Sequence, residues 1–157
     1  DHGLARYAEA LVRDLPGCPP NLADMPGAGA AGGVGAGLFA LGARGESGVG
    51  LVTRAVGLAD RLDECDLVVT GEGSFDHQSL RGKLVSGVAE AAAARGVPCT
   101  VVAGRVAVGK REAAAAGIDR TLSLSEHFGS TSEAMARPAE GLRELGAVLA
   151  RRWRRVL

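Results

Sequence analysis

The sequence predicts an α/β fold, with layers of parallel sheet covered by helices on both faces. Two short, mainly apolar and β-branched runs, residues 66–70 and 99–103, are typical of buried strands, and a helical pattern lies between them. Strands buried on both faces lack polar alternation, so these runs fit a parallel sheet. The predicted order of strand, helix, strand, helix, strand builds such a sheet through helical crossovers.

The first third of the chain predicts helices joined by a loop of small residues. Apolar residues recur at helical spacing over residues 3–15, and the prolines and glycines of 16–20 end this helix. The glycine- and alanine-rich segment Pro26 to Gly37 then leads into a tightly packed helix. Ser47 is positioned to cap a further helix that carries apolar residues from Val49 to Leu62.

The remaining elements follow the first strand. The turn-prone Gly71-Glu72-Gly73 is expected to end strand 66–70, and a helix is expected over 78–95. A helix near 108–116 precedes a short strand around Thr121 and Leu122. The final helix begins at Pro138, and its apolar stripe is Leu142, Leu145, Leu149 and Trp153.

Charge and composition exclude several classes of protein. The 157 residues contain 18 Lys and Arg and 18 Asp and Glu, without the basic excess that binding to nucleic acid or anionic membranes requires. Cys18, Cys65 and Cys99 are odd in number and far apart, and we expect Cys65 and Cys99 to be small buried hydrophobes. These residues show no signal-peptide pattern and no long uncharged apolar run. We therefore expect a soluble, cytoplasmic protein.

The glycine-rich segment formally matches the dinucleotide fingerprint at Gly27, Gly29 and Gly32. That fingerprint needs a hydrophobic strand directly before its first glycine, and residues 21–26 are a poor strand that ends in proline. A dinucleotide-dependent oxidoreductase is therefore the less favoured alternative. Such a loop can still bring backbone N–H groups to an anion at a helix N-terminus, or its glycines can serve close helix packing.

Polar side chains are densest just after the first strand. Glu72, Asp76, Gln78 and Lys83 lie within a dozen residues, where ligands gather at the carboxyl ends of parallel strands. A carboxylate there can hold Mg²⁺ or accept a hydroxyl proton, and a lysine can neutralise phosphate charge. Asp76 fits a structural role equally well, as the cap of a helix that begins at 77 or 78, with Lys83 in solvent.

Taken together, the two segments resemble the type 1 glycerate kinases, which carry a PGAGAAGG-like loop and, further along, DLVITGEGR-x-D-x-Q-T-x-x-GK. The chain departs from this pattern at Ser74, where the family usually has arginine, and at Ser79, where it has threonine. The matching segments, in the family's order and spacing, are Pro26 to Gly33, Asp66 to Gly73, Asp76, Gln78, Gly82-Lys83 and Val102 to Gly104.

The resemblance implies ATP-dependent phosphorylation of glycerate with Mg²⁺, in a cleft between two α/β domains. In this interpretation, residues 1–73 finish an inserted domain and residues 74–157 complete the other. The family is longer, and its N-terminal half carries DSFKG-like and GGSATNDGG-like segments that do not occur here. We therefore expect a C-terminal fragment of the enzyme, or alternatively a non-catalytic remnant that still binds ligand.

The general needs of phosphoryl transfer, which are positioning and charge neutralisation, then suggest roles for individual residues. Asp76 is expected to accept or orient the hydroxyl proton of glycerate, and Glu72 to hold Mg²⁺ directly or through water. Lys83 is expected to meet phosphate or the substrate carboxylate, and Gln78 to orient a substrate oxygen. The expected ligand-binding glycines are Gly27, Gly29, Gly32, Gly33, Gly71 and Gly73.

Overall fold

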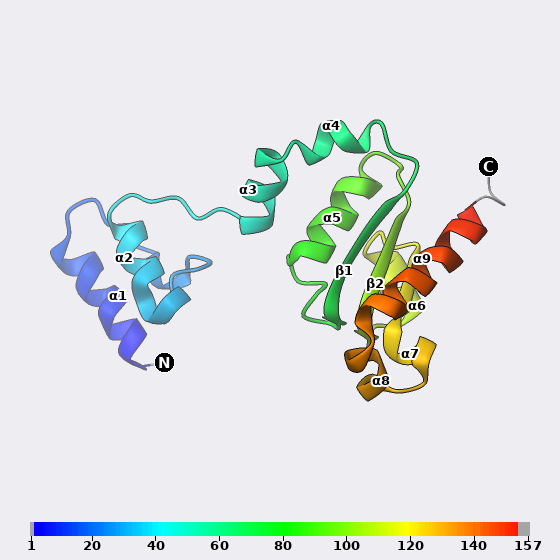
Figure 1. The fold of residues 1–157 in the computed structure, drawn as a ribbon. Coiled ribbons are helices and arrows are strands. Elements are labelled where there is room, and N and C mark those ends of the chain that lie inside the picture. Colours follow the sequence, from blue (N-terminus) through cyan, green and yellow to red (C-terminus); the bar gives the residue numbers. More distant parts are fainter. Residues whose placement is uncertain (1, 154–157) are drawn as a thin grey trace. The chain divides into compact units, whose positions relative to one another are not determined.

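The computed structural model describes residues 2–153, which belong to two compact units that divide between Ser47 and Gly48 (Figure 1). The domain boundary expected after Gly73 stays a prediction. None of the helices described in the two units is both long enough and apolar enough to cross a membrane.

The first unit consists of helices and short turns around a small core. The core is formed by Ala8, Leu22, Ala28, Ala36 and Phe39. No strand occurs in the described part of this unit, so the glycine-rich loop lacks the strand that a dinucleotide fingerprint requires. The elements are α1 (His2–Asp14), the 3₁₀ helices η1 (Leu22–Asp24) and η2 (Ala30–Gly33), and α2 (Val34–Ala40).

The second unit is built on a parallel sheet in the order β1-β2-β3, which confirms the predicted α/β fold. Val68 pairs with Cys99 between β1 and β2, and Thr100 pairs with Arg120 between β2 and β3. The strands are β1 (Val68–Phe75), β2 (Cys99–Val106) and β3 (Arg120–Ser123), and the crossover helices are α5 (Leu84–Ala93) and α6 (Lys110–Ala115).

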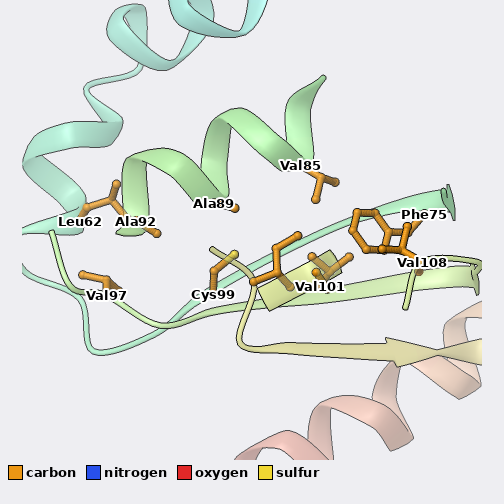
Figure 2. Close-up of a cluster of buried hydrophobic side chains, with 12 residues drawn as sticks. Leu62, Phe75, Val85, Ala89, Ala92, Val97, Cys99, Val101 and Val108 are labelled. Carbon is orange, nitrogen blue, oxygen red and sulfur yellow. The ribbon is translucent and has the colours of Figure 1, made fainter. Parts of the chain in front are cut away.

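Helices cover both faces of this sheet. Figure 2 shows Val85, Ala89 and Ala92 of α5 directed at Cys99 and Val101 of β2. Further apolar side chains, which include Phe75 and Ile118, belong to the same buried cluster. On the other face, Leu124, Ala134 and Leu145 pack against Val102 and Leu122. The helices on that face are α7 (Leu124–Phe128), α8 (Thr131–Ala136) and α9 (Pro138–Trp153).

Several predicted boundaries were wrong. The strand does not turn at residues 71–73 but continues to Phe75. The helix expected from residue 78 begins at Leu84, because turns occupy residues 76–83. The helix expected after Ser47 is broken at Gly57, whose φ of 61° is left-handed, into α3 (Gly48–Ala55) and α4 (Leu58–Leu62). The short helices α7 and α8 were not predicted.

The cysteines differ in their surroundings. Cys65 is exposed, which corrects the prediction that it is buried. Cys99 is fully buried in the core, and this burial, with a smaller contribution from the Asp119 charge, raises the pKa of its thiol to about 11. The backbone N–H of Cys99 donates to Asp119 Oδ2 at 2.7 Å. Cys99 therefore behaves as a small hydrophobe, as predicted.

Candidate active site

The glycines that flank Glu72 have different surroundings. A Cβ atom added at Gly71 would lie 2.1 Å from the carbonyl oxygen of Val102, and one added at Gly104 would lie 2.6 Å from that of Gly73. β1 and β2 therefore approach too closely for side chains at Gly71 and Gly104. A Cβ at Gly73 would meet nothing within 4 Å. The close packing of β1 and β2 thus explains why residue 71 is a glycine, whereas no contact explains the glycine at residue 73.

Glu72 lies on β1, in register with Ala103 of β2, and is half-buried. Its Oε1 atom is buried and has no hydrogen-bond partner among the described residues. A carboxylate oxygen removed from water without a donor is costly, so it calls for a donor or a cation. Its position on an extended strand, rather than in a turn, is what places this oxygen inside the protein.

The segment after β1 is held by a tight set of hydrogen bonds. The backbone N–H of Gln78 donates to Asp76 Oδ1 at 2.8 Å, which makes an Asx turn. The backbone N–H of Asp76 donates to Ser79 Oγ at 3.1 Å, and the buried Ser79 hydroxyl donates to the Ser74 carbonyl at 3.4 Å. The alternative in which Asp76 caps a helix beginning at 77 or 78 is therefore wrong, because Asp76 shapes a turn instead.

This turn brings three of the predicted site residues together. Lys83 Nζ donates to Gln78 Oε1 at 3.4 Å, and both side chains are exposed. Only Oδ1 of Asp76 is engaged by Gln78, and no other hydrogen bond to this carboxylate occurs among the described residues. Asp76, Gln78 and Lys83 thus form one polar loop directly after the strand that carries Glu72.

The glycine-rich loop belongs to the other unit. Gly27, Gly32 and Gly33 have φ values of 95°, 69° and 101°, which favour glycine, whereas Gly29 does not need this conformation. A Cβ at Gly35 would lie 2.0 Å from the Gly27 carbonyl oxygen. The structure thus explains these glycines by backbone conformation and packing. Gly27 to Gly33 belong to the first unit, whereas Glu72 to Lys83 belong to the second.

The donor set is sparse for a metal held by protein alone. Among the described residues there is no cluster of three or more His, Cys, Asp or Glu side chains that could hold an ion. Mg²⁺, however, is usually bound by one or two carboxylates together with substrate phosphates and water. The unpartnered oxygen of Glu72 fits such a ligand.

Two histidines have partners that sequence reasoning did not supply. His127 Nε2 pairs with Glu144 Oε2 across α7 and α9, and the His127 ring meets Phe128 edge-on. His77 Nδ1 lies 3.7 Å from Glu112 Oε1 at the surface. The partners of both lie far along the chain, so no local pattern could have indicated them.

The fold and this segment define an α/β protein whose acidic and basic side chains follow the carboxyl end of a parallel strand. Comparison with known proteins makes the class more specific. The model of the glycerate kinase family matches residues 1–154. The chain belongs to the glycerate kinase family.

Individual relatives agree with this membership. The chain is 46% identical over 127 residues to an uncharacterised Mycobacterium bovis protein, covering 81% of this chain and 33% of that protein. It is 40% identical over 135 residues to glycerate 2-kinase of Escherichia coli K12, covering 85% of this chain and 35% of that protein. The chain thus spans about a third of the length of these curated relatives.

A solved structure is similar in fold. The crystal structure of a protein assigned as glycerate kinase 2 from Salmonella typhimurium LT2 matches with a TM-score of 0.55 and 38% sequence identity. The match covers 78% of this chain and 30% of that protein. The mixed α/β architecture is therefore shared with a glycerate kinase structure.

Proposed function

We propose that the natural protein containing this chain transfers a phosphoryl group from ATP to glycerate, in the cytoplasm and with Mg²⁺. The observation that carries the proposal is the polar loop of Asp76, Gln78 and Lys83, joined directly to the strand of Glu72 in a chain of the glycerate kinase family. Phosphoryl transfer depends mainly on positioning and charge neutralisation, and these residue types can supply both.

Asp76 is the proposed acceptor of the hydroxyl proton. The Asx turn engages its Oδ1 and holds the side chain in one orientation, which leaves Oδ2 to meet the substrate hydroxyl. Glu72 is the proposed carboxylate ligand of Mg²⁺, because its Oε1 is buried without a partner. When bound, Mg²⁺ would neutralise charge on the phosphates.

Lys83 and Gln78 are the proposed anion and oxygen contacts. Lys83 is exposed, and the 3.4 Å contact to Gln78 is the one hydrogen bond of its side chain among the described residues, so it can turn toward a phosphate or a carboxylate at little cost. Gln78 would orient a substrate oxygen. Gly73, where a side chain is absent and space is open, and the loop Gly27 to Gly33 would offer backbone N–H groups.

The test is glycerate-dependent ADP formation by the natural protein, comparing Asp76→Asn with wild type. Asparagine keeps the side-chain oxygen that accepts the backbone N–H of Gln78, so we expect the Asx turn to remain. The substitution removes only the carboxylate that is proposed to accept the hydroxyl proton. We expect turnover to fall by about 10²–10⁴-fold. Asp60→Asn, an exposed aspartate on α4, is the matched control and should keep full turnover.

An Asp76→Asn protein that turns over within a factor of a few of wild type would remove Asp76 from this role. A wild-type protein that binds ATP without turnover would instead favour the alternative of a non-catalytic ligand-binding remnant. The dinucleotide-dependent oxidoreductase loses its basis, since η1 rather than a strand precedes the glycine-rich loop.

A further inference from the structure

Arg105 of β2 lies beside the polar segment of β1. The register pairs it with Ser74, two residues after Glu72. Neighbouring strands lie about 4.7–4.9 Å apart, and paired residues of parallel strands direct their side chains to the same face, so the side chains of Ser74 and Arg105 are adjacent. The sequence did not indicate Arg105 as a site residue, because only the pairing of β1 with β2 brings it next to Ser74.

Both residues line a cavity of about 1020 Å³ beside β1, whose other walls come mainly from β2, α8 and α9. Most of these walls are apolar. Among the described residues that line the cavity, Glu72 and Arg105 are the charged ones. Both lie in the second half of their strands, toward the carboxyl ends where ligands of parallel sheets gather. The cavity thus has one acidic and one basic group at the end where the proposed active site lies.

The guanidinium group of Arg105 is not used by the rest of the described chain. Arg105 is exposed, and its side chain has no hydrogen bond or ion pair among the described residues, not even with Glu72 in the same cavity. Arg95, by contrast, donates to Asp63 Oδ1 at 2.9 Å. A guanidinium is a planar fork of five N–H donors that matches the two oxygens of a carboxylate or a phosphate. Arg105 therefore offers an oxyanion-binding group beside the proposed active site.

The residue that faces Arg105 across the strands is also a position where the chain departs from its family. Ser74 stands where the glycerate kinase pattern usually has arginine. Because residues 74 and 105 are register partners, long side chains at either position extend into the same space. The small side chain of Ser74 leaves that space to Arg105. A positive charge that is missing from β1 is therefore present on β2.

We propose that Arg105 binds an oxyanion of the substrates, a phosphate of ATP or the carboxylate of glycerate, in place of the arginine that is missing at residue 74. Glu72 and Arg105 then have complementary tasks, because the carboxylate binds a cation and the guanidinium binds the oxyanion beside it. Positioning and charge neutralisation dominate phosphoryl transfer, so this contact also promotes the reaction. The identity of the oxyanion rests on the proposed function.

The test measures the dissociation constants of ATP and of glycerate, titrated separately by calorimetry into the natural protein and its Arg105→Gln variant. We expect one of the two constants to rise by about 10–150-fold, because hydrogen bonds to charged groups contribute that much to binding. A rise for glycerate identifies the carboxylate as the partner of Arg105, and a rise for ATP identifies a phosphate. Arg111→Gln, which changes an exposed arginine of α6, is the matched control and should leave both constants unchanged.

A second variant tests whether residues 74 and 105 share one role. Ser74→Arg, added to Arg105→Gln, returns a guanidinium to the same space from the neighbouring strand, so we expect it to recover about tenfold or more of the lost affinity. Ser74→Gln in the same background adds a long polar side chain without the charge and should recover none of it. Equal recovery by both substitutions would contradict a role for the positive charge.

Unchanged dissociation constants for both ligands in Arg105→Gln would overturn the proposal. A lower urea midpoint of this variant with unchanged affinities would also overturn it, because Arg105 would then serve an ion pair within the protein. Binding and turnover separate the two hypotheses. A wild-type protein that binds its ligands through Arg105 but forms no ADP refutes the proposed kinase function alone, whereas ADP formation with unaltered binding in Arg105→Gln refutes this inference alone.

Discussion

Gly71 and Gly73 belong to one short motif, but a side chain would clash with the neighbouring strand at Gly71 and would meet no atom at Gly73. Gly71 is required because the carbonyl oxygen of Val102 occupies the space of a side chain. Gly73 faces open space, so its glycine has no steric cause within the described residues. Packing therefore accounts for Gly71 without a ligand, whereas it does not account for Gly73, and the ligand contacts proposed at both glycines stay predictions.

We predict that Gly71→Ala destabilises the natural protein by about 1–3 kcal/mol, because the added methyl group forces β1 away from β2. Urea denaturation, followed by circular dichroism, measures this. Gly73→Ala is the matched control and should leave the midpoint nearly unchanged. An unchanged midpoint for Gly71→Ala would show that the strands separate at no cost.

At the scale of residues, the sequence located the polar segment but not its conformation. Asp76, Gln78 and Lys83 were predicted as a group because they follow a buried strand, and the structure brings them into one loop. The Asx turn was not foreseen. Short polar side chains such as Asp76 bond to nearby backbone in turns as readily as at helix caps, so spacing alone does not separate the two.

At the scale of elements, tertiary pairing explains where the prediction of β1 was wrong. Glycines at 71 and 73 locally favour a turn, but pairing with residues 102–106 of β2 keeps the chain extended to Phe75. The fully buried Phe75 anchors that extension in the core. The helices α7 and α8 were not predicted, because their five and six residues are too few to show helical periodicity.

The N-cap of α8 gives a prediction at this scale. Ser130 Oγ accepts the backbone N–H of Glu133 at 3.4 Å, and losing such a cap costs about 1 kcal/mol. We expect Ser130→Ala to lower the free energy of unfolding of the natural protein by that amount in urea titrations. Ser130→Asp keeps an acceptor and should restore most of the loss. Equal destabilisation by both substitutions would contradict a capping role.

At the scale of the whole molecule, the order of elements was predictable and the division into units was not. Buried apolar runs and helical patterns indicated the parallel α/β sheet, which the structure confirms. The division near Ser47 depends on which segments pack together over long distances in sequence. The cavity beside β1 could not be predicted either, because residues of α8 line it and the sequence did not indicate that helix.

The segment between the units should be the first site of proteolysis. Residues 41–47 are all exposed and include no helix or strand, and Arg44 offers a tryptic site. We expect brief trypsin treatment of the natural protein to cut after Arg44 before any other site within this chain, as N-terminal sequencing of the fragments will show. Arg44→Gln should abolish that cut. Earlier cleavage inside β1 to β3 would contradict the two-unit division.

The close approach of β1 and β2 has a consequence for recognising related proteins by motif. Gly71 and Gly104 are demanded by the backbone of the neighbouring strand, so descendants that have lost all catalysis would still retain them. A survey that scores these two glycines would count inactive copies as enzymes. Under the proposed function, Asp76 and Lys83 are the positions whose loss would distinguish an inactive copy from an active one, because no comparable packing requires them.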